Sequence, residues 1–298
     1  MSSYFSFSKT PKLSHTEKVE ELKRRVGGDL PSDMLPNGDL DATLVRFLVA
    51  RSYHLDEAEK MLKKTLQWRK DNRLGEILKK PPSDKVLADL RATIPHSLHG
   101  FDKEGRPIYM ELTGRIDPEL LKAKLTKEDI VHAHLWMMEY QVRMLMKRAS
   151  DRKQHTVDSM FNILDLEGIS MSHISSHMLD IFKAIAKIDQ DNYPEQLGGA
   201  YLVNAPWIFS TIWSAVSVFL DKRTRSKVQV LSAGAKQKKA LLEVIDADTL
   251  PEYLGGTCKC KGGCLSGEGC THPEGKTIHH IAMEEDLAKV VSGEVVLP

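Results

Sequence analysis

The segment from Gln196 to Leu220 carries no charged residue, although charged residues make up 28% of the chain. Its core, from Trp207 to Leu220, places large apolar side chains around much of a helix, with only serines and a threonine as polar groups. A surface helix of a globular protein normally shows a polar face. Pro206 interrupts the run, and the helix is too short to cross a bilayer. The segment therefore predicts either a buried core helix or a lid.

We favour a mobile lid helix over a hydrophobic pocket, with an inner face that covers an apolar ligand and an outer face that can lie on a bilayer. When closed, such a helix shields the pocket, and when open it lets a lipid exchange with the membrane. The side chains expected to serve the lid are Trp207, Phe209, Ile212, Trp213, Val216 and Phe219.

A dense basic cluster, DKRTRSK, runs from Asp221 to Lys227 directly after the predicted lid. Charge runs are commonly solvated faces. The position beside a lid instead favours contact with a phosphate, an inositol or a membrane headgroup. Over the whole chain 42 basic and 41 acidic residues nearly cancel, so we expect no nucleic-acid partner.

Alternating helical and strand patterns predict an α/β fold in two parts. We expect a flexible tail over residues 1–15 and a helical bundle over 16–82, with Thr16 as the cap of its first helix. Short apolar strands then alternate with helices over 83–257, which is typical of a mostly parallel sheet. Residues 258–298 form a cysteine-rich C-terminal extension.

Several segments in this order resemble the CRAL-TRIO lipid-binding family. LVRFLVARSYHLDEAEKMLKKTLQWRKDN, beginning at Leu44, is similar to the N-terminal helical unit of that family. DKEGRPIYMEL from Asp102, ILDLEGIS from Ile163, NYPEQLGGAYLVNAP from Asn192 and LPEYLGG from Leu250 resemble its lipid-binding domain. Five segments in register are a specific signal, and the nearest branch is that of the phosphatidylinositol/phosphatidylcholine transfer proteins of the secretory pathway.

The resemblance implies a site for an inositol headgroup. The positions that match the family's headgroup contacts are Arg51, Pro107, Glu195, Thr224 and Lys227. Their chemistry is coherent, because an arginine offers a fixed fork of donors to a phosphodiester. Inositol hydroxyls require an acceptor, such as the Glu195 carboxylate, and donors, such as the Thr224 hydroxyl and the Lys227 ammonium.

A second, choline-lipid site is implied at Ser170, Ser172 and Tyr109. Leu98 stands where the family has another tyrosine, and Ser52 stands where it has a lysine. Losing the tyrosine removes a phosphate donor and part of an aromatic wall for the choline cation. The ligand expected here is therefore phosphatidylinositol, with phosphatidylcholine as a further candidate.

Four cysteines, Cys258, Cys260, Cys264 and Cys270, gather near the end of the chain beside His272. Thiolates with a histidine can hold zinc, but the irregular spacing without a Cys-x-x-Cys pair favours a flexible, reduced tail and no metal or other cofactor. The N-terminus lacks the basic-then-apolar order of a secretory signal, so we expect a cytoplasmic protein that lies transiently on membranes such as the Golgi or endosomes.

Signatures of catalysis, such as a Gly-x-Ser-x-Gly elbow or a His-Glu-x-x-His helix, are missing from the sequence, so we expect a carrier rather than an enzyme. Three alternatives stay open, one of which is an enzyme that acts on the bound lipid through a zinc site. The same fold can bind a sterol or a tocopherol-like molecule, or it can act as an adaptor that presents lipid to a phosphoinositide kinase.

Overall fold

The computed structural model describes residues 13–27, 30–35, 38–260, 263–265 and 288–292. Most of the tail expected at residues 1–15 lies outside these ranges. Helix α1 (His15–Val26) is capped by Ser14 rather than by the predicted Thr16. The Ser14 side chain accepts from the Glu17 amide and the Glu17 carboxylate accepts from the Ser14 amide, a reciprocal cap that satisfies two free donors.

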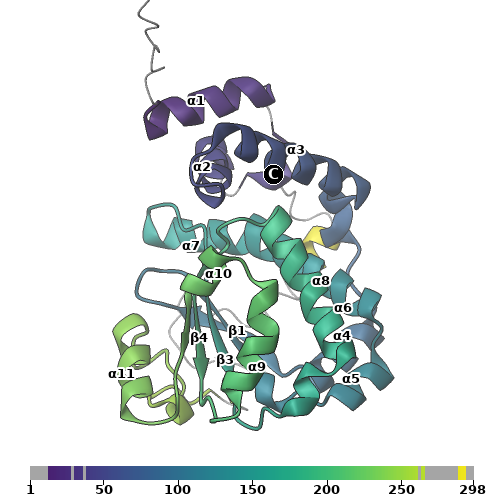
Figure 1. Cartoon of the computed structure of the whole chain (residues 1–298), viewed down its shortest axis with the longest axis vertical. Helices are drawn as coiled ribbons and strands as arrows, with labels where there is room; N and C mark the ends of the chain where they lie inside the picture. Colours follow the sequence, from purple (N-terminus) through teal and green to yellow (C-terminus); the bar gives the residue numbers. More distant parts are fainter. Residues whose placement is uncertain (1–12, 28–29, 36–37, 261–262, 266–287, 293–298) are drawn as a thin grey trace, which may run out of the picture.

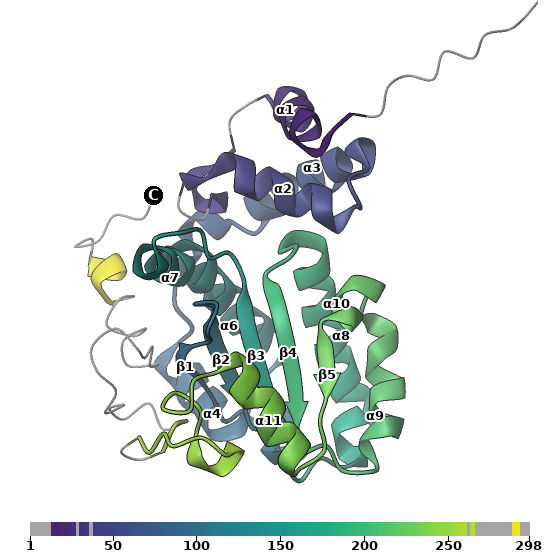
Figure 2. The same ribbon diagram turned by 90° about the vertical axis from the view of Figure 1, so that its left-hand side faces the viewer.

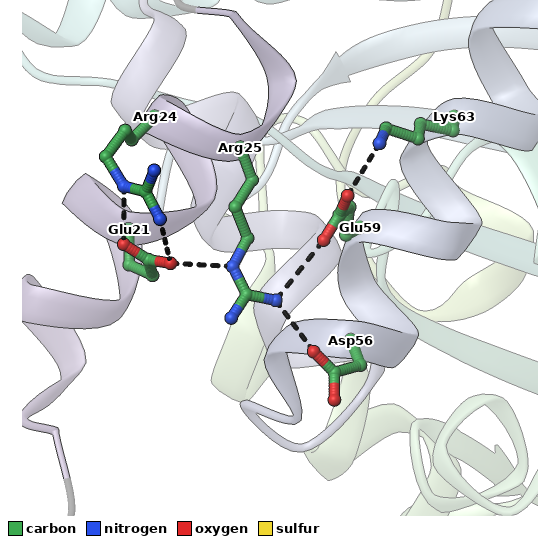
Figure 3. A network of polar contacts seen from close by, with 6 residues as sticks. All are labelled: Glu21, Arg24, Arg25, Asp56, Glu59 and Lys63. Atoms are coloured by element: carbon green, nitrogen blue, oxygen red, sulfur yellow. Dashed lines mark hydrogen bonds and ion pairs between the residues drawn. The ribbon is translucent and has the colours of Figure 1, made fainter.

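Helices α1, α2 (Leu40–Ala50) and α3 (Leu55–Asp71) form the N-terminal helical unit around their own apolar core, at the top of Figure 1. An exposed network joins α1 to α3 on the surface (Figure 3). Arg25 donates to Glu21 on its own helix and to Asp56 and Glu59 on α3. The core, rather than these screened contacts, is expected to hold the unit together.

A buried ion pair clamps the helical unit to the rest of the molecule. Arg69 on α3 donates to both carboxylate oxygens of Glu139 on α6 (Lys127–Tyr140), at 2.7 and 2.8 Å. Arg69 also donates to Asp33 at 2.6 Å. The Glu139 side chain is fully buried, and a buried pair of this kind is costly to break because one charge is left alone.

The α/β part contains a five-stranded sheet in the order β1-β2-β3-β4-β5. Its strands are β1 (His96–Phe101), β2 (Pro107–Glu111), β3 (Met160–Asp165), β4 (Leu197–Val203) and β5 (Val228–Val230). Strands β1 and β2 pair antiparallel across the DKEG turn, and the other pairings are parallel. The predicted α/β class with a mostly parallel sheet is confirmed.

The remaining helical elements connect and cover these strands. They are η1 (Ser32–Met34), η3 (Leu74–Lys79), α4 (Asp84–Thr93), η4 (Thr113–Arg115), α5 (Pro118–Lys124), a π-helical turn η5 (Gln141–Leu145), α7 (Met146–Lys153), η6 (Met171–Ile174), α8 (Ser176–Asn192), α9 (Phe209–Val216), η7 (Ser217–Phe219), α10 (Lys222–Ser226), α11 (Ala235–Val244) and η8 (Glu252–Leu254). None of the helices in the described ranges is long and apolar enough to span a bilayer.

The sheet separates two layers of helices (Figures 1 and 2). Helix α11 covers one face, which we call the closed face, and α6, α8 and α9 lie on the other, which we call the lid face. Strand alternation assigns the side chains to these faces. On the central strands the closed face carries Ile108, Met110, Phe161, Ile163, Tyr201 and Val203, and the lid face carries Tyr109, Glu111, Asn162, Leu164, Ala200 and Leu202.

Candidate functional site

Three of the five predicted headgroup residues lie at one edge of the sheet. Because β2, β4 and β5 belong to the parallel part of the sheet, their amino ends share an edge. Pro107 begins β2, Glu195 lies two residues before β4, and Lys227 directly precedes β5. The parallel topology thus gathers residues that are far apart in the sequence.

Glu195 is the centre of a charged cluster at this edge. Its carboxylate accepts from Lys227 Nζ at 2.9 Å and from Arg223 Nε at 2.5 Å. Lys227 also donates to the Leu197 carbonyl at 2.6 Å. The sequence analysis included Arg223 only within the basic run, whereas the structure pairs it directly with Glu195. Two cations and one acceptor can together hold a phosphate and neighbouring hydroxyls.

The backbone at Glu195 is held in an unusual conformation. Its φ angle is 63°, in the left-handed region that residues other than glycine rarely adopt. Two residues earlier, the Tyr193 hydroxyl donates to Glu139 at 2.7 Å, and its ring packs edge-on against Trp68 of α3. Burial and the neighbouring Glu139 charge raise the pKa of Tyr193 well above its usual value, so this hydroxyl stays a donor. The clamp that joins the two parts of the molecule thereby also positions Glu195.

Arg46 on α2 is a buried cation that the sequence analysis missed. It is 6% exposed, and burial lowers the pKa of its guanidinium to about 10, although the charges of Asp158, Asp39 and Glu195 oppose the shift. In the side-chain orientation of Gln196 that gives hydrogen-bond partners to both its oxygen and its nitrogen, the oxygen accepts from the Arg46 guanidinium. The nitrogen then donates to the Asp158 carbonyl. An arginine inside the apolar segment LVRFLVA was the signal available in the sequence.

The structure does not join the other two predicted headgroup residues to Glu195. Thr224 lies on α10, where its amide and its hydroxyl both donate to Asp221, at 2.7 and 3.2 Å. Arg51 ends α2 and donates to the Ala50 carbonyl, and it makes no ion pair among the described residues. Neither Arg51 nor Thr224 has a hydrogen bond to Glu195 or Lys227 among the described residues.

The residues of the possible choline-lipid site lie elsewhere. Ser170 and Ser172 follow the carboxyl end of β3, with their hydroxyl oxygens 2.8 Å apart and the His173 ring 3.2 Å from Ser170 Oγ. Tyr109 lies within β2 on the lid face and donates to Glu111 at 2.7 Å. Burial raises the pKa of Tyr109 well above its usual value, with the adjoining Glu111 charge acting in the same direction.

The segment predicted as a lid forms a shorter helix than expected. Helix α9 covers Phe209–Val216 and η7 continues to Phe219, so Trp207 precedes the helix and is 88% exposed. Phe209 and Ile212 are buried on the lid face against Ala200 and Leu202. The far end is tied to α8, where Gln190 donates to the Phe219 carbonyl at 2.9 Å. Trp213, Val216 and Phe219 are half-buried.

Apolar side chains around the lid face are incompletely buried. Of the 17 residues of α8 only Ile181 and Ala186 are buried, while Leu179 and Phe182 are half-buried. On the sheet, Asn162 Oδ1 is buried and has no hydrogen-bond partner among the described residues. A hollow of about 530 Å³ lies instead on α3 and is lined by charged residues, including Asp56, Glu59 and Lys63, which do not suit acyl chains.

Comparison with known proteins places this geometry in a family. The family model described as "CRAL/TRIO domain" matches residues 92–256. The Sec14 cytosolic factor of Schizosaccharomyces pombe is 36% identical over 78% of this chain and 81% of its own length. The phosphatidylinositol/phosphatidylcholine transfer protein SFH9 of Arabidopsis thaliana is 37% identical over 78% of this chain but only 40% of its own length. The chain thus spans well under half of that plant relative.

A solved structure shows the same arrangement of elements. The crystal structure of Sfh5 superposes with a TM-score of 0.63 over 93% of this chain and 100% of that chain. The two sequences are 18% identical, so the likeness concerns the fold alone.

Proposed function

The chain belongs to the CRAL/TRIO domain family, and from that membership we propose that it binds phosphatidylinositol and exchanges it with membranes as a carrier rather than an enzyme. The observation that carries the proposal is the cluster of Glu195, Arg223 and Lys227 beside the lid segment. Relatives named as phosphatidylinositol/phosphatidylcholine transfer proteins support the ligand class.

In the proposed complex, the headgroup lies at the amino edge of the sheet. Lys227 and Arg223 supply positive charge to the phosphodiester, and Thr224 on the intervening helix supplies a hydroxyl. Glu195 accepts hydrogen bonds from inositol hydroxyls. Arg51 approaches from the helical unit, which makes the orientation of that unit part of the binding site.

The acyl chains in this proposal lie along the lid face, among the half-buried side chains of α8 and α9. Transfer of a two-chain lipid from a bilayer exposes many methylenes, each costing about 0.8 kcal/mol in water, so a covered apolar path is required. Leu179 and Phe182 on α8 and Trp213 on α9 are apolar and only half-buried, which supports this location.

The α9–η7 segment acts as the lid and touches the membrane in this proposal. Trp207 before α9 and Val218 within η7 are 88% and 69% exposed, and an exposed aromatic ring suits the interface between headgroups and acyl chains. This gives a transient peripheral contact with a membrane.

Phosphatidylcholine is a second ligand within the same proposal. Its headgroup would meet the Ser170–Ser172 pair, with Tyr109 further along the lid face. Leu98, opposite Tyr109 in the strand register, is fully buried and adds no donor. We therefore expect weaker selection for choline lipids than for phosphatidylinositol.

The test is mass spectrometry of lipids that co-purify with the full chain, combined with a vesicle transfer assay. Thr224→Asp places a negative charge where the phosphate is proposed to lie, so bound phosphatidylinositol should fall at least tenfold, or about 1.4 kcal/mol. Ser226→Asp is the matched control, since it adds the same charge on the exposed side of α10. A wild-type protein that carries no phospholipid and transfers none would refute the proposal. Equal losses in both variants would refute the headgroup site.

A further inference from the structure

Four side chains with metal-binding chemistry meet at the edge of the sheet where β1 lies. They are His99 on β1 and Cys258, Cys260 and Cys264 from the start of the C-terminal extension. Their exposures are 0%, 4%, 7% and 8% respectively. Over these residues the expectation of a flexible tail is wrong, because the three thiols are buried. Cys270 and His272 lie outside the described residues.

The ligand atoms are close enough for a single ion. Cys258 Sγ lies 3.3 Å from Cys260 Sγ, 3.5 Å from Cys264 Sγ and 3.5 Å from His99 Nε2. All four atoms fall within 4.8 Å of one another. A tetrahedral zinc site with ordinary bond lengths has edges of about 3.8 Å between sulfurs and about 3.6 Å between sulfur and nitrogen. The observed cluster is therefore near these dimensions before any adjustment.

The same distances exclude disulfides among the three described cysteines. A disulfide needs sulfur atoms about 2.05 Å apart, whereas Cys258 Sγ lies 3.3 and 3.5 Å from the other two sulfurs. The compactness of the cluster also favours one ion over an iron–sulfur cluster, whose cysteine ligands are spread over several irons. Three thiolates and an imidazole are soft and borderline donors in the numbers that a closed structural zinc site uses.

The backbone positions the cysteines independently of their side chains. The Cys258 amide donates to the Leu250 carbonyl, and the Cys258 carbonyl accepts from Glu252, both at 3.1 Å. Gly256 makes the approach possible, since a Cβ there would lie 1.9 Å from the Leu250 oxygen. The Gly263 amide, at a φ of 96°, donates to the Cys260 carbonyl at 2.9 Å and so returns the chain toward Cys258.

The fourth candidate ligand, His99, lies 159 residues before Cys258 in the sequence. Its Nε2 also lies 3.0 Å from the Thr249 carbonyl, so ligation through Nε2 exchanges that hydrogen bond for a metal bond. Strand β1 is an edge strand. A metal at this point would fasten the C-terminal extension to the sheet.

We propose that His99, Cys258, Cys260 and Cys264 bind one structural zinc ion. Binding converts three thiols to thiolates and releases their protons to solvent, while the imidazole binds in its neutral form. The ion crosslinks β1 to the extension and leaves no open coordination position, so it has a structural role. This inference does not depend on the proposed lipid function.

The first test is the metal content of the full chain, purified under reducing conditions from zinc-supplemented cells and measured by inductively coupled plasma mass spectrometry. We expect about one zinc per chain in the wild type and at least a tenfold lower content in Cys258→Ser, Cys264→Ser and His99→Gln. Cys270→Ser is the matched control and should keep its zinc, since the four described ligands complete the site. Zinc retained in Cys258→Ser, or lost in Cys270→Ser, would overturn this ligand set.

A second measurement uses the wild-type protein, so its result does not depend on whether the variants fold. The wild-type protein is stripped with a chelator, its reduced thiols are counted, and Co(II) is added. Tetrahedral thiolate coordination should give intense visible bands and a thiolate-to-metal charge-transfer band, which zinc then bleaches. Reduced thiols without these bands and without zinc would mean that the cysteines are only buried apolar groups, and the proposal would be wrong. Visible absorption from iron in the purified protein would likewise overturn it.

Discussion

The closed face of the sheet is tightly packed. On β2 and β3 its side chains are each at most 2% exposed, namely Ile108, Met110, Phe161 and Ile163. They form one apolar cluster with Leu241, Ile245, Leu250 and Leu254. On the lid face of the same two strands, Tyr109, Glu111, Asn162 and Leu164 are half-buried, and two of them are hydrogen-bonded to each other. Adjacent residues of one strand thus meet different surroundings. The difference shows that one face is tightly packed, whereas the other, where we propose that the acyl chains lie, is incompletely covered.

Two adjacent residues of β3 provide the strongest test of this difference. Ile163→Ala on the closed face should lower the free energy of unfolding by about 2–5 kcal/mol, because a cavity is left in a tightly packed core. Leu164→Ala on the lid face should lower the free energy of unfolding by less than half of that amount. It should instead reduce the amount of bound lipid. Equilibrium unfolding in denaturant and lipid analysis of both variants decide this. Equal losses of stability would remove the distinction between the faces.

The exposed end of the proposed lid offers a test that concerns transfer rather than stability. Trp207→Ala should slow lipid transfer between vesicles roughly tenfold, because burial of a large apolar side chain in the membrane contributes about 1.5–3 kcal/mol. Its melting temperature should stay close to that of the wild type. Tyr253→Ala is the control, as Tyr253 is a 51% exposed aromatic residue in η8 on the side of the closed face. An equal effect of both variants on transfer would argue against a specific membrane contact of the lid.

A pH-dependent contact holds α8 against α6 on the lid face. Burial disfavours the charged form of His134, but Asp189, 2.7 Å away, outweighs it and raises the pKa of His134. Because the pKa in the folded state is above the unfolded value of about 6.5, the stabilisation is fully present below pH 6.5 and is lost as the pH rises through the folded value. Unfolding free energies at pH 6 and pH 8 should differ less in His134→Gln than in the wild type. The exposed His155→Gln variant should keep the wild-type difference, and a His134→Gln protein with an unchanged difference would contradict the prediction.

The surface network of Figure 3, distant from both faces, should show the smallest effect. Arg25→Ala removes the contacts of α1 with Asp56 and Glu59 on α3, together with the Arg25–Glu21 pair within α1. The network lies at the surface and its charges are screened, so the loss of thermal stability should be slight at low salt and should vanish at high salt. Thermal melts at two salt concentrations measure it. A large effect that salt does not change would mean that this network, rather than the apolar core, holds α1 in place.

The segments that could be predicted from the sequence are those whose local chemistry is strong. The mostly parallel sheet formed within residues 83–257, where alternating strand and helix periodicity predicted it. The helix around Phe209 and Ile212 was also predicted, though its start at Trp207 was not correct, because the serines and apolar residues of this segment set no sharp boundary.

The candidate site was predictable only in part. Glu195, Lys227 and Pro107 were expected from motifs, but the pairing of Arg223 with Glu195 depends on two strands that lie side by side. Arg46 was missed because its apolar neighbours in LVRFLVA are a weak signal, and an arginine in such a segment can also lie on a solvated helix face. Its burial follows from the docking of α2 against Gln196.

The sequence by itself determined the α/β class, the order of the elements and the family, because these depend on periodicity, caps and short motifs that are read along the chain. Only the tertiary structure decided which side chains meet across long separations. The meeting of His99 with Cys258, and of Arg69 with Glu139, is of this kind. The physical reason is that such contacts depend on strand register and helix docking, which many residues determine together. An irregular cysteine spacing therefore concealed a compact cluster that becomes evident when β1 lies beside the end of the chain.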